Sequence, residues 1–360
     1  MPALAFALRP FRLRLARPLE TAHGLIEARE GVLIEARDGE GRTGFGEVAP
    51  LPAFGTESLQ SALELLDRAI RRASGARPPD GAGAAESIVS AAQLPSSAPA
   101  SLCGLEQALL DLAARRRGLP LFRLLAEAFS LAPPAARVPV SVLLSERPLG
   151  ALAAEAGAAR ERGFTTVKLK VAHAPLAEDV ARVRAVRAAV GPACALRLDA
   201  NGGFTPGQAA DALAALALFA PEFCEQPVAP GQPEAWKELA RLCPLAADES
   251  AAHQSELAAL LSSGALVAVV LKPASLGGLL AAGRLGLRAL SAGVAPIAST
   301  GLDGAVGRAG AAHLAAALGS RRAAGLGTGH LLAEDLGADP APPLAGAIVL
   351  SEAPGLGHFR

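Results

Sequence analysis

Five charged residues recur along the chain at nearly constant intervals, and each stands at the end of a short apolar run. They are Lys170, Asp199, Glu225, Asp248 and Lys272, separated by 29, 26, 23 and 24 residues. An interval of this length holds one strand, one helix and two short loops. Because the strand ends of a barrel of repeated βα units form one rim, the spacing predicts that all five side chains lie on that rim.

Short runs rich in Val, Leu and Ala alternate with helical stretches through the second part of the chain. There are eight of them: Val138–Leu144, Thr165–Val171, Ala195–Ala200, Glu222–Pro227, Leu245–Ser250, Val267–Pro273, Val294–Thr300 and Ala323–Thr328. Thr205, Pro206 and Gln208 form the start signal of one intervening helix, with Thr205 as N-cap. Eight strands close a barrel, so the sequence predicts an α/β fold with a (β/α) barrel over residues 133–335.

The first part of the chain has the pattern of an α+β domain, predicted over residues 1–132. Alternating apolar residues indicate an antiparallel meander between Phe6 and Val48. Apolar residues with helical spacing predict helices near residues 59–70 and 105–112. The stretch Gly75–Ala100 is rich in Gly, Pro, Ala and Ser and is typical of a mobile connection.

The segment that follows the barrel, residues 336–360, is predicted to return to the N-terminal domain. Ala347–Leu350 has the pattern of one further strand, which we expect to join that domain.

The composition excludes several classes of partner. Thirty-four basic and 34 acidic residues balance, and no basic stripe interleaved with aromatics occurs, which argues against nucleic acid. The apolar runs are far shorter than the roughly 20 residues of a membrane helix. The four cysteines form no C-x-x-C pair, which favours a reduced, cytoplasmic protein. A small-molecule ligand is therefore expected, and a homo-oligomer is compatible with the sequence.

Two lysines precede the carboxylates on the predicted rim. Residues i and i+2 of a strand face the same side, so Lys168 and Lys170 both point into the barrel. Buried charges have to be paired or to coordinate a ligand, which makes these lysines candidates for a functional site. A salt bridge that lines the barrel interior is the alternative for any one of them.

The three carboxylates, Asp199, Glu225 and Asp248, lie on successive predicted strands. Their negative charges repel one another unless a cation lies between them. Carboxylate oxygens without a nearby thiolate or histidine suit a hard divalent ion, which points to Mg²⁺, with Mn²⁺ as the alternative. Such an ion binds a substrate carboxylate and stabilises the charge of its enediolate.

Proton removal next to a carboxylate also requires a base whose pKa is near neutral, whereas free lysine titrates near 10.4. The like charge of Lys168 lowers the pKa of its neighbour, so we predict that Lys170 is the base. Lys272 comes from a strand beyond the metal ligands and is expected to address the opposite face of the substrate, as a second acid or base or as a fixed cation.

The motifs at these strand ends resemble those of the enolase superfamily, specifically its muconate-lactonizing-enzyme subgroup. The similarity rests on Lys168-x-Lys170, Asp199-Ala200-Asn201, Glu225-Gln226-Pro227, Asp248-Glu249-Ser250 and Lys272-Pro273, in that order, and covers nearly the whole chain. The resemblance implies a (β/α) barrel of the enolase-superfamily type, a capping domain that carries substrate-specificity loops, and a small-molecule carboxylate as substrate.

Within the subgroup, the chain is most similar to the o-succinylbenzoate synthases. The stretch from Gly46 to Phe54, Arg29-x-Gly31 and Gly325-Leu326-Gly327-Thr328-Gly329 carry this resemblance. It implies a Mg²⁺-dependent lyase that dehydrates 2-succinyl-6-hydroxy-2,4-cyclohexadiene-1-carboxylate in menaquinone biosynthesis. Lys170 would take the α-proton and help the hydroxide leave, and Lys272 would stabilise the enediolate.

Substrate contacts are expected from the loops at the barrel mouth. The candidates are Asn201, Ser299, Thr300, Gly301, Gly327 and Phe54, although Ser299-Thr300 and the glycines after Asn201 depart from the synthase pattern. Glu249 either faces away from Asp248 or bends back to support it, and His23 is a further candidate in the capping domain. Gly301, Gly304 and Gly307 either present free N–H groups to an anionic substrate or form an ordinary loop.

Two other functions compete with the synthase. An N-acylamino acid racemase or dipeptide epimerase would use the same metal and both lysines for proton exchange on the two faces of the α-carbon. The absence of an acidic Asp-x-Asp pair near Gly327 argues against an epimerase for cationic dipeptides. A non-catalytic metal-binding barrel is the third hypothesis, and it predicts no deuterium incorporation into a carboxylate substrate.

Overall fold

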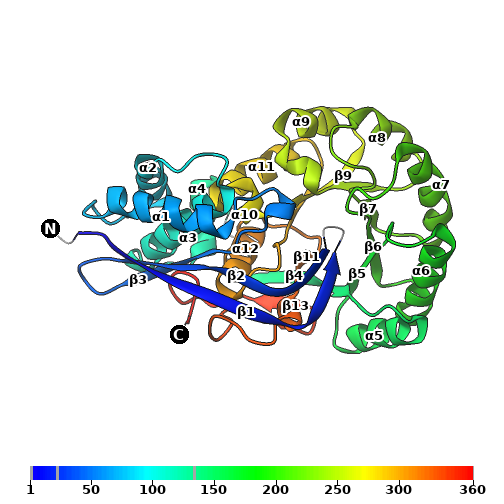
Figure 1. The fold of residues 1–360 in the computed structure, drawn as a ribbon, viewed down its shortest axis with the longest axis horizontal. Helices are drawn as coiled ribbons and strands as arrows, with labels where there is room; N and C mark the ends of the chain where they lie inside the picture. Colours follow the sequence, from blue (N-terminus) through cyan, green and yellow to red (C-terminus); the bar gives the residue numbers. More distant parts are fainter. Residues whose placement is uncertain (1–2, 22–23, 133–134, 360) are drawn as a thin grey trace.

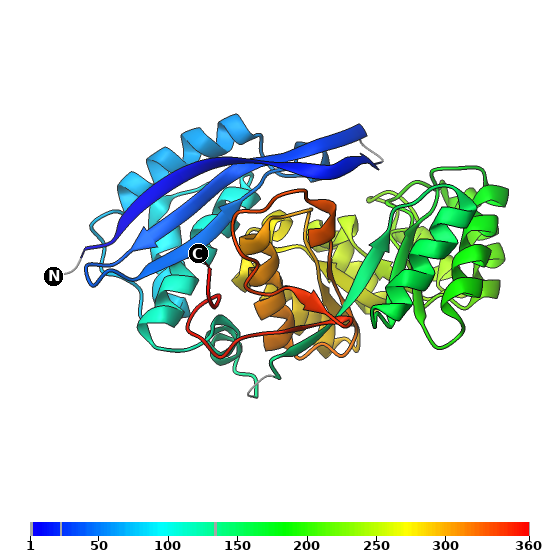
Figure 2. The same cartoon turned by 90° about the horizontal axis from the view of Figure 1, so that it is seen from below.

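The N-terminal part of the chain forms an antiparallel sheet covered by helices. A computed structural model describes residues 3–21, 24–132 and 135–359. Strands β1 (Ala5–Thr21), β2 (Gly24–Arg37) and β3 (Thr43–Val48) lie side by side in that order. Figure 2 shows the long β1–β2 hairpin extending from the N-terminal helices toward the barrel. This part confirms the predicted α+β capping domain.

The described residues of this N-terminal part form the helices α1 (Leu59–Ala73), α2 (Ala82–Ala92), α3 (Pro99–Arg116) and α4 (Leu121–Ala128). Helix α3 approaches β3 so closely that a Cβ on Gly46 would lie 1.9 Å from the backbone oxygen of Gly104. Helix α2 lies within the stretch that the sequence predicted as a mobile connection, and that prediction is wrong. This stretch forms a helix whose residues Ala85, Ile88 and Ala92 are buried in the core.

The second part is the predicted (β/α) barrel (Figure 1). Its eight parallel strands are β4 (Arg137–Leu144), β5 (Thr166–Lys170), β6 (Ala195–Asp199), β7 (Phe223–Glu225), β8 (Leu245–Ala247), β9 (Leu266–Leu271), β10 (Ala295–Ala298) and β11 (Ala324–Gly327). Neighbours in sequence pair from β4 to β10. The ring closes because β11 pairs with β4 and Gly325 forms a bridge with Ser299.

The barrel helices connect successive strands and cover the outside of the ring (Figure 1). They are α5 (Leu149–Glu161), α6 (Leu176–Val190), α7 (Pro206–Leu216), α8 (Pro233–Leu239), α9 (Gln254–Ser263), α10 (Pro273–Leu276), α11 (Leu279–Ser291) and α12 (Ala305–Leu318). The capping box at Thr205 and Gln208 is present as predicted. None of the helices in the described ranges is long and apolar enough to cross a membrane.

The chain after the barrel does not add a strand to the N-terminal sheet. Strands β12 (Pro343–Leu344) and β13 (Ala347–Val349) form a hairpin, and β13 pairs with the start of β4. The prediction that this strand joins the N-terminal domain is therefore wrong. The segment after it does contact the helices of that domain, since the Leu356 N–H donates to Asp111 Oδ1 at 2.7 Å.

A buried carboxylate connects the two parts of the molecule. Glu106 of α3 accepts a hydrogen bond from the Leu280 N–H at 3.1 Å, at the start of α11. Gly278 precedes this helix, and a Cβ there would lie 2.5 Å from Glu106 Oε2. Burial raises the pKa of Glu106 to about 7, because a carboxylate is hard to charge away from water.

Glu106→Gln should flatten part of the pH dependence of stability. A carboxyl whose pKa rises from 4.5 to about 7 on folding favours the folded state below pH 4.5, and that contribution is lost as the pH rises through 7. The free energy of unfolding of the wild type should therefore fall, relative to the variant, by about 3 kcal/mol between pH 4.5 and 8. Urea unfolding of both proteins at several pH values measures this difference.

The exposed Glu64→Gln on α1 is the control, and its curve should run parallel to the wild type. Parallel curves for Glu106→Gln and the wild type would contradict the prediction.

Candidate active site

The candidate residues stand at the carboxyl ends of five consecutive barrel strands. Lys168 and Lys170 belong to β5, Asp199 ends β6 and Glu225 ends β7. Asp248 directly follows β8 and Lys272 directly follows β9. Lys170 pairs in register with Asp199, and Asp199 with Glu225. The strand order therefore brings all six side chains to one rim.

Two lysines bind the carboxylates directly. Lys168 Nζ lies 2.8 Å from Asp199 Oδ2 and 2.7 Å from Glu225 Oε1, and Lys272 Nζ forms an ion pair with Asp248. Burial by itself lowers a lysine pKa, but the attraction of Asp199 and Glu225 outweighs it and raises the pKa of Lys168. The pKa of Lys272 is raised in the same way, chiefly by Asp248. Both lysines are therefore held as cations.

The carboxylates themselves are deeply buried, with at most 6% of each residue exposed. Burial raises the pKa of Glu225, and the negative charges of Asp199 and Asp248 raise it further. Burial also favours the neutral form of Asp199, but the attraction of Lys168 and Lys170 prevails and lowers its pKa. Three acidic groups at this spacing require positive charge between them.

The donor set fits a hard divalent ion, although the described residues contain no group of three or more His, Cys, Asp or Glu side chains arranged as a metal site. The lysines bind the carboxylate oxygens instead, and an ion would compete with Lys168 for Asp199 and Glu225. Three buried carboxylates on neighbouring strands offer the oxygen ligands that Mg²⁺ and Mn²⁺ prefer. These residues could therefore hold the predicted ion.

Lys170 differs from the other two lysines, because its pKa is lowered. Burial is the largest cause, Asp199 opposes it, and the like charges of Lys168 and Lys272 add to the lowering. From the sequence, the lowered pKa of Lys170 was expected from the charge of Lys168 alone, whereas burial by the surrounding protein contributes most to it. A lysine with a lowered pKa is able to act as a general base near neutral pH.

Gln226 connects two of the carboxylate positions. It is fully buried, and its Oε1 accepts hydrogen bonds from the Asp248 N–H at 3.0 Å and the Ser250 N–H at 3.1 Å. Its Nε2 donates to Ser250 Oγ at 2.7 Å and to the Val228 oxygen at 2.9 Å. Gln226 directly follows Glu225, so the backbone of Asp248 is fixed relative to Glu225.

Glu249 turns back toward the site. It begins a short 3-10 helix, η3 (Glu249–Ala252), and its Oε1 accepts a hydrogen bond from Asn201 Nδ2 at 3.1 Å. Asn201 lies in the left-handed region with φ 44°, and its N–H donates to Asp199 Oδ1 at 3.0 Å. Of the two orientations that the sequence left open for Glu249, the structure shows the one near Asp248.

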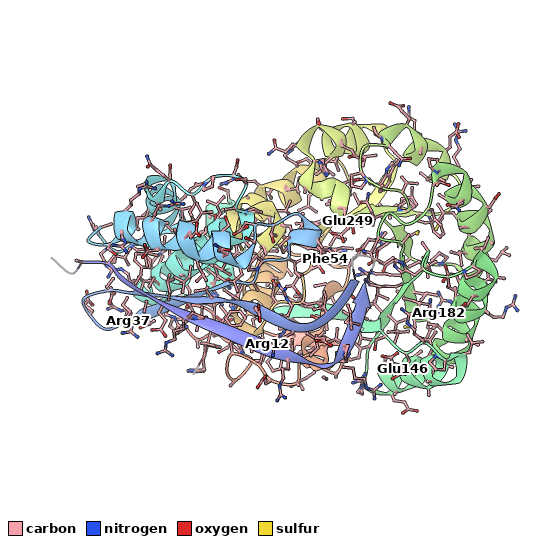
Figure 3. All side chains as sticks on the ribbon, viewed as in Figure 1. Arg12, Arg37, Phe54, Glu146, Arg182 and Glu249 are labelled. Atoms are coloured by element: carbon pink, nitrogen blue, oxygen red, sulfur yellow. The ribbon has the colours of Figure 1, made fainter. Side chains whose placement is uncertain are left out.

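A cavity of about 100 Å³ lies over these residues, between the barrel mouth and the capping loops. Asn201, Ser299, Thr300, Gly301 and Phe54, the predicted substrate contacts, line it together with Lys168, Lys170, Asp199 and Lys272. Figure 3 labels Phe54, which ends the short helix η1 (Pro52–Phe54) of the capping domain.

The structure corrects the predicted lining in two respects. Gly327 is not among the lining residues, because it packs against the backbone of Ser141, and Thr328 lines the cavity instead. Sequence reasoning also did not assign to the lining six residues that are apolar or small: Leu19, Leu51, Ser141, Leu143, Leu302 and Gly325. Leu51 and Gly325 belong to stretches that carry the synthase resemblance, but they were not named as substrate contacts. His23 lies outside the described residues.

The start of α12 does not offer free N–H groups to a substrate. The Gly304 N–H donates to Glu47 Oε1 at 2.6 Å, and the Gly307 N–H donates to Glu47 Oε2 at 2.8 Å. The Ala305 N–H donates to Asp335 Oδ1 at 2.7 Å. Protein carboxylates therefore occupy this helix terminus, so of the two alternatives that the sequence left open, free N–H groups are excluded for Gly304 and Gly307.

Two family models match the chain. Residues 151–358 match the model described as "Enolase C-terminal domain-like", and residues 9–80 match "MenC, N-terminal domain". The first match covers more than half of the 360 residues and contains every candidate lysine and carboxylate.

Individual relatives divide between two activities. An o-succinylbenzoate synthase of Mycobacterium ulcerans is 42% identical over 53% of this chain and 57% of its own length, so the chain spans about half the length of the curated synthases it matches. A hydrophobic dipeptide epimerase of Enterococcus faecalis is 29% identical over 86% of both proteins. The crystal structure of a dipeptide epimerase from this organism, with Mg and L-Leu-L-Tyr, matches all of both chains with a TM-score of 0.89 and 28% identity.

Gln226→Met should weaken binding of a divalent ion. Methionine has a similar volume but leaves the N–H groups of Asp248 and Ser250 unpaired, so the Asp248 carboxylate loses its fixed position. Loss of such an orienting contact lowers metal affinity by roughly 10- to 100-fold. Isothermal titration with Mg²⁺ measures the affinity.

Gln107→Met is the matched control, because Gln107 is also buried and binds a backbone oxygen, that of Val306 at 2.7 Å, away from the carboxylates. Equal Mg²⁺ affinities of wild type and Gln226→Met, with both folded by circular dichroism, would contradict the prediction.

Proposed function

The chain belongs to the enolase superfamily, and from this premise we propose that it is an o-succinylbenzoate synthase. The reaction would be the Mg²⁺-dependent dehydration of 2-succinyl-6-hydroxy-2,4-cyclohexadiene-1-carboxylate, a step of menaquinone biosynthesis. The enzyme would then be a lyase. Lys170 and Lys272 on either side of three buried carboxylates support the proton abstraction that the synthase shares with the epimerase. The observation that carries the choice of the synthase is the apolar wall that the capping loops form over the site, together with the match of residues 9–80 to the MenC N-terminal domain.

Asp199, Glu225 and Asp248 would hold the ion, which supplies positive charge next to the carboxylate of the substrate. Asn201 and Glu249 would keep these ligands oriented through the hydrogen bonds described above. Lys272, held as a cation by Asp248, would place a second positive charge over the reacting centre.

Lys170 would perform both proton transfers. Its neutral amine takes the proton α to the carboxylate, and the electron pair of the broken C–H bond delocalises into the carboxylate as an enediolate. The Lys170 ammonium then gives its proton to the leaving hydroxyl while the C–O bond breaks. The products are water and the aromatic ring, and Lys170 returns to its neutral form.

The apolar part of the cavity supports a ring-shaped substrate. Leu19, Leu51, Phe54, Leu143 and Leu302 line it beside the charged groups. A cyclohexadiene ring would pack against this wall while its carboxylate faces the rim. The greater identity to the synthase, 42% over the matched region, also favours this assignment.

A dipeptide epimerase or N-acylamino acid racemase is the second candidate. The observation in its favour is the similarity to the Enterococcus faecalis epimerase, which extends over 86% of the chain. Lys170 and Lys272 line one cavity and could exchange protons on opposite faces of an α-carbon. The loop after β11, Gly327-Thr328-Gly329, has no acidic pair for a cationic side chain, so this epimerase would act on apolar dipeptides.

Lys170→Ala should abolish dehydration of the cyclohexadiene substrate, with kcat reduced by roughly 10³-fold or more, because the base is lost. Production of the aromatic ring, followed by absorbance in the presence of Mg²⁺, measures this rate. The exposed Lys237→Ala on α8 is the control and should retain the wild-type rate.

The same assay separates the competing functions. Wild-type protein that leaves the cyclohexadiene unchanged but racemises N-succinyl amino acids or epimerises dipeptides would move the assignment to the second candidate. If no carboxylate substrate exchanged its α-proton for deuterium in D₂O, a non-catalytic barrel would be indicated.

Removal of divalent ions should stop the reaction reversibly. The buried carboxylates require a cation to accept a substrate carboxylate beside them. Dialysis against EDTA should therefore abolish turnover, and either Mg²⁺ or Mn²⁺ should restore it. Full activity after dialysis, with residual metal excluded by elemental analysis, would contradict the assignment of Asp199, Glu225 and Asp248.

A further inference from the structure

Arg29 of β2 connects a loop of the capping domain with a loop of the barrel. The residue is only 3% exposed. Its Nη2 donates to the Ala49 oxygen, and its Nη1 donates to the Pro50 oxygen at 3.2 Å. Its Nε donates to the Leu302 oxygen at 3.3 Å. One guanidinium therefore binds three carbonyls from segments about 250 residues apart in sequence.

Both of these loops line the candidate active-site cavity. Leu51 and Phe54 follow the carbonyls of Ala49 and Pro50, and Thr300, Gly301 and Leu302 form the opposite segment. The two segments touch, because a Cβ on Gly301 would lie 3.6 Å from Leu51 Cδ1. The Arg29 contacts therefore lie directly behind the apolar wall of the cavity.

The charges around Arg29 keep it in this place. Asp303 and Glu47 are buried and attract the guanidinium. Glu47 in turn accepts hydrogen bonds from Gly304 and Gly307, so the barrel loop is fixed to β3 just beyond Leu302. Among the described residues, the groups named here as binding or attracting Arg29 belong to the junction between the two loops, and none of them is a candidate metal ligand or a rim lysine.

We propose that Arg29 is a positioning residue that holds residues 49–54 against residues 299–303 and thereby sets the substrate affinity of the active site. The inference rests on the proposed function for its choice of substrate. Arg29 acts through the backbone of Leu51, Phe54 and Leu302 and does not touch the reacting atoms. Its loss should weaken substrate binding and leave the chemical step largely unchanged.

A lysine cannot replace this arginine. A guanidinium offers five donors in a planar fork, whereas an ammonium is a compact point charge on a flexible stem. Arg29→Lys keeps the positive charge beside Asp303 and Glu47 and so preserves folding, but it cannot bind the three carbonyls at once. Arg29→Met removes the charge as well and leaves both carboxylates without this neighbour.

The control is Arg37→Met. Arg37 ends the same strand, β2, and pairs with Glu35 instead of a loop. Figure 3 labels it at the end of the sheet remote from the barrel. Arg37→Met therefore removes an arginine from β2 without changing a contact to either loop.

Two measurements test the proposal on the full chain. Hydrogen–deuterium exchange followed by mass spectrometry should show faster exchange of residues 51–54 and 299–303 in Arg29→Lys, with exchange in β5 and β6 unchanged. With the cyclohexadiene substrate and Mg²⁺, KM should rise by roughly tenfold while kcat changes by less than about threefold. Arg37→Met should match the wild type in both measurements.

Unchanged exchange in both loops of Arg29→Lys, or a fall in kcat at constant KM, would overturn the proposal. If Arg29→Met loses its thermal unfolding transition together with its activity, Arg29→Lys, which keeps the positive charge, provides the test. If the wild type does not convert the cyclohexadiene, the proposed synthase function fails. The loop exchange then decides by itself whether Arg29 positions the two segments.

Discussion

The compensation of buried charge at the barrel rim is the constraint on which the site depends. Asp199, Glu225 and Asp248 are withdrawn from water, so each must be matched by a cation within contact distance. Lys168 and Lys272 provide that charge in the structure, and both remain protonated because of it. Lys170 lies beside this cluster without an equally strong anionic partner, and burial therefore lowers its pKa. Whether each of the three lysines is held as a cation or can act as a base therefore depends on whether it contacts a carboxylate.

The rim could be predicted from sequence because strand parity and repeat length leave few choices. Two lysines at i and i+2, and acidic residues one βα unit apart, must meet at one end of a parallel barrel. This regularity explains why the predicted strands and the enolase-type fold are confirmed. The contacts that depend on distant segments could not be predicted in this way. Three contacts involve partners that no local pattern identifies: the binding of Glu47 in β3 to the start of α12, the lining of the cavity by Thr328 in place of Gly327, and the pairing of β13 with β4.

Small residues explain why helix α2 and the close packing of β3 on α3 could not be predicted from the sequence. The stretch that contains α2 is rich in alanine and serine, and its composition resembles a connection, but its small side chains fit the narrow space beside α3. Gly46 and Gly104 similarly allow β3 and α3 to approach at backbone distance. This packing brings Glu47 and Arg29 to the barrel mouth, so composition that looks uninformative positions the charged groups of the domain junction.

The closure of the barrel has a consequence for biosynthesis of the chain. Ser141 of β4 donates to the oxygen of Ala324 in β11, a residue 183 positions later, and β13 then pairs with the other end of β4. While the ribosome is still adding the intervening strands, β4 has one edge without its native partner. The nascent chain therefore carries an unsatisfied edge on this first strand of the barrel while the 183 residues from Ser141 to Ala324, about half of the chain, are being added.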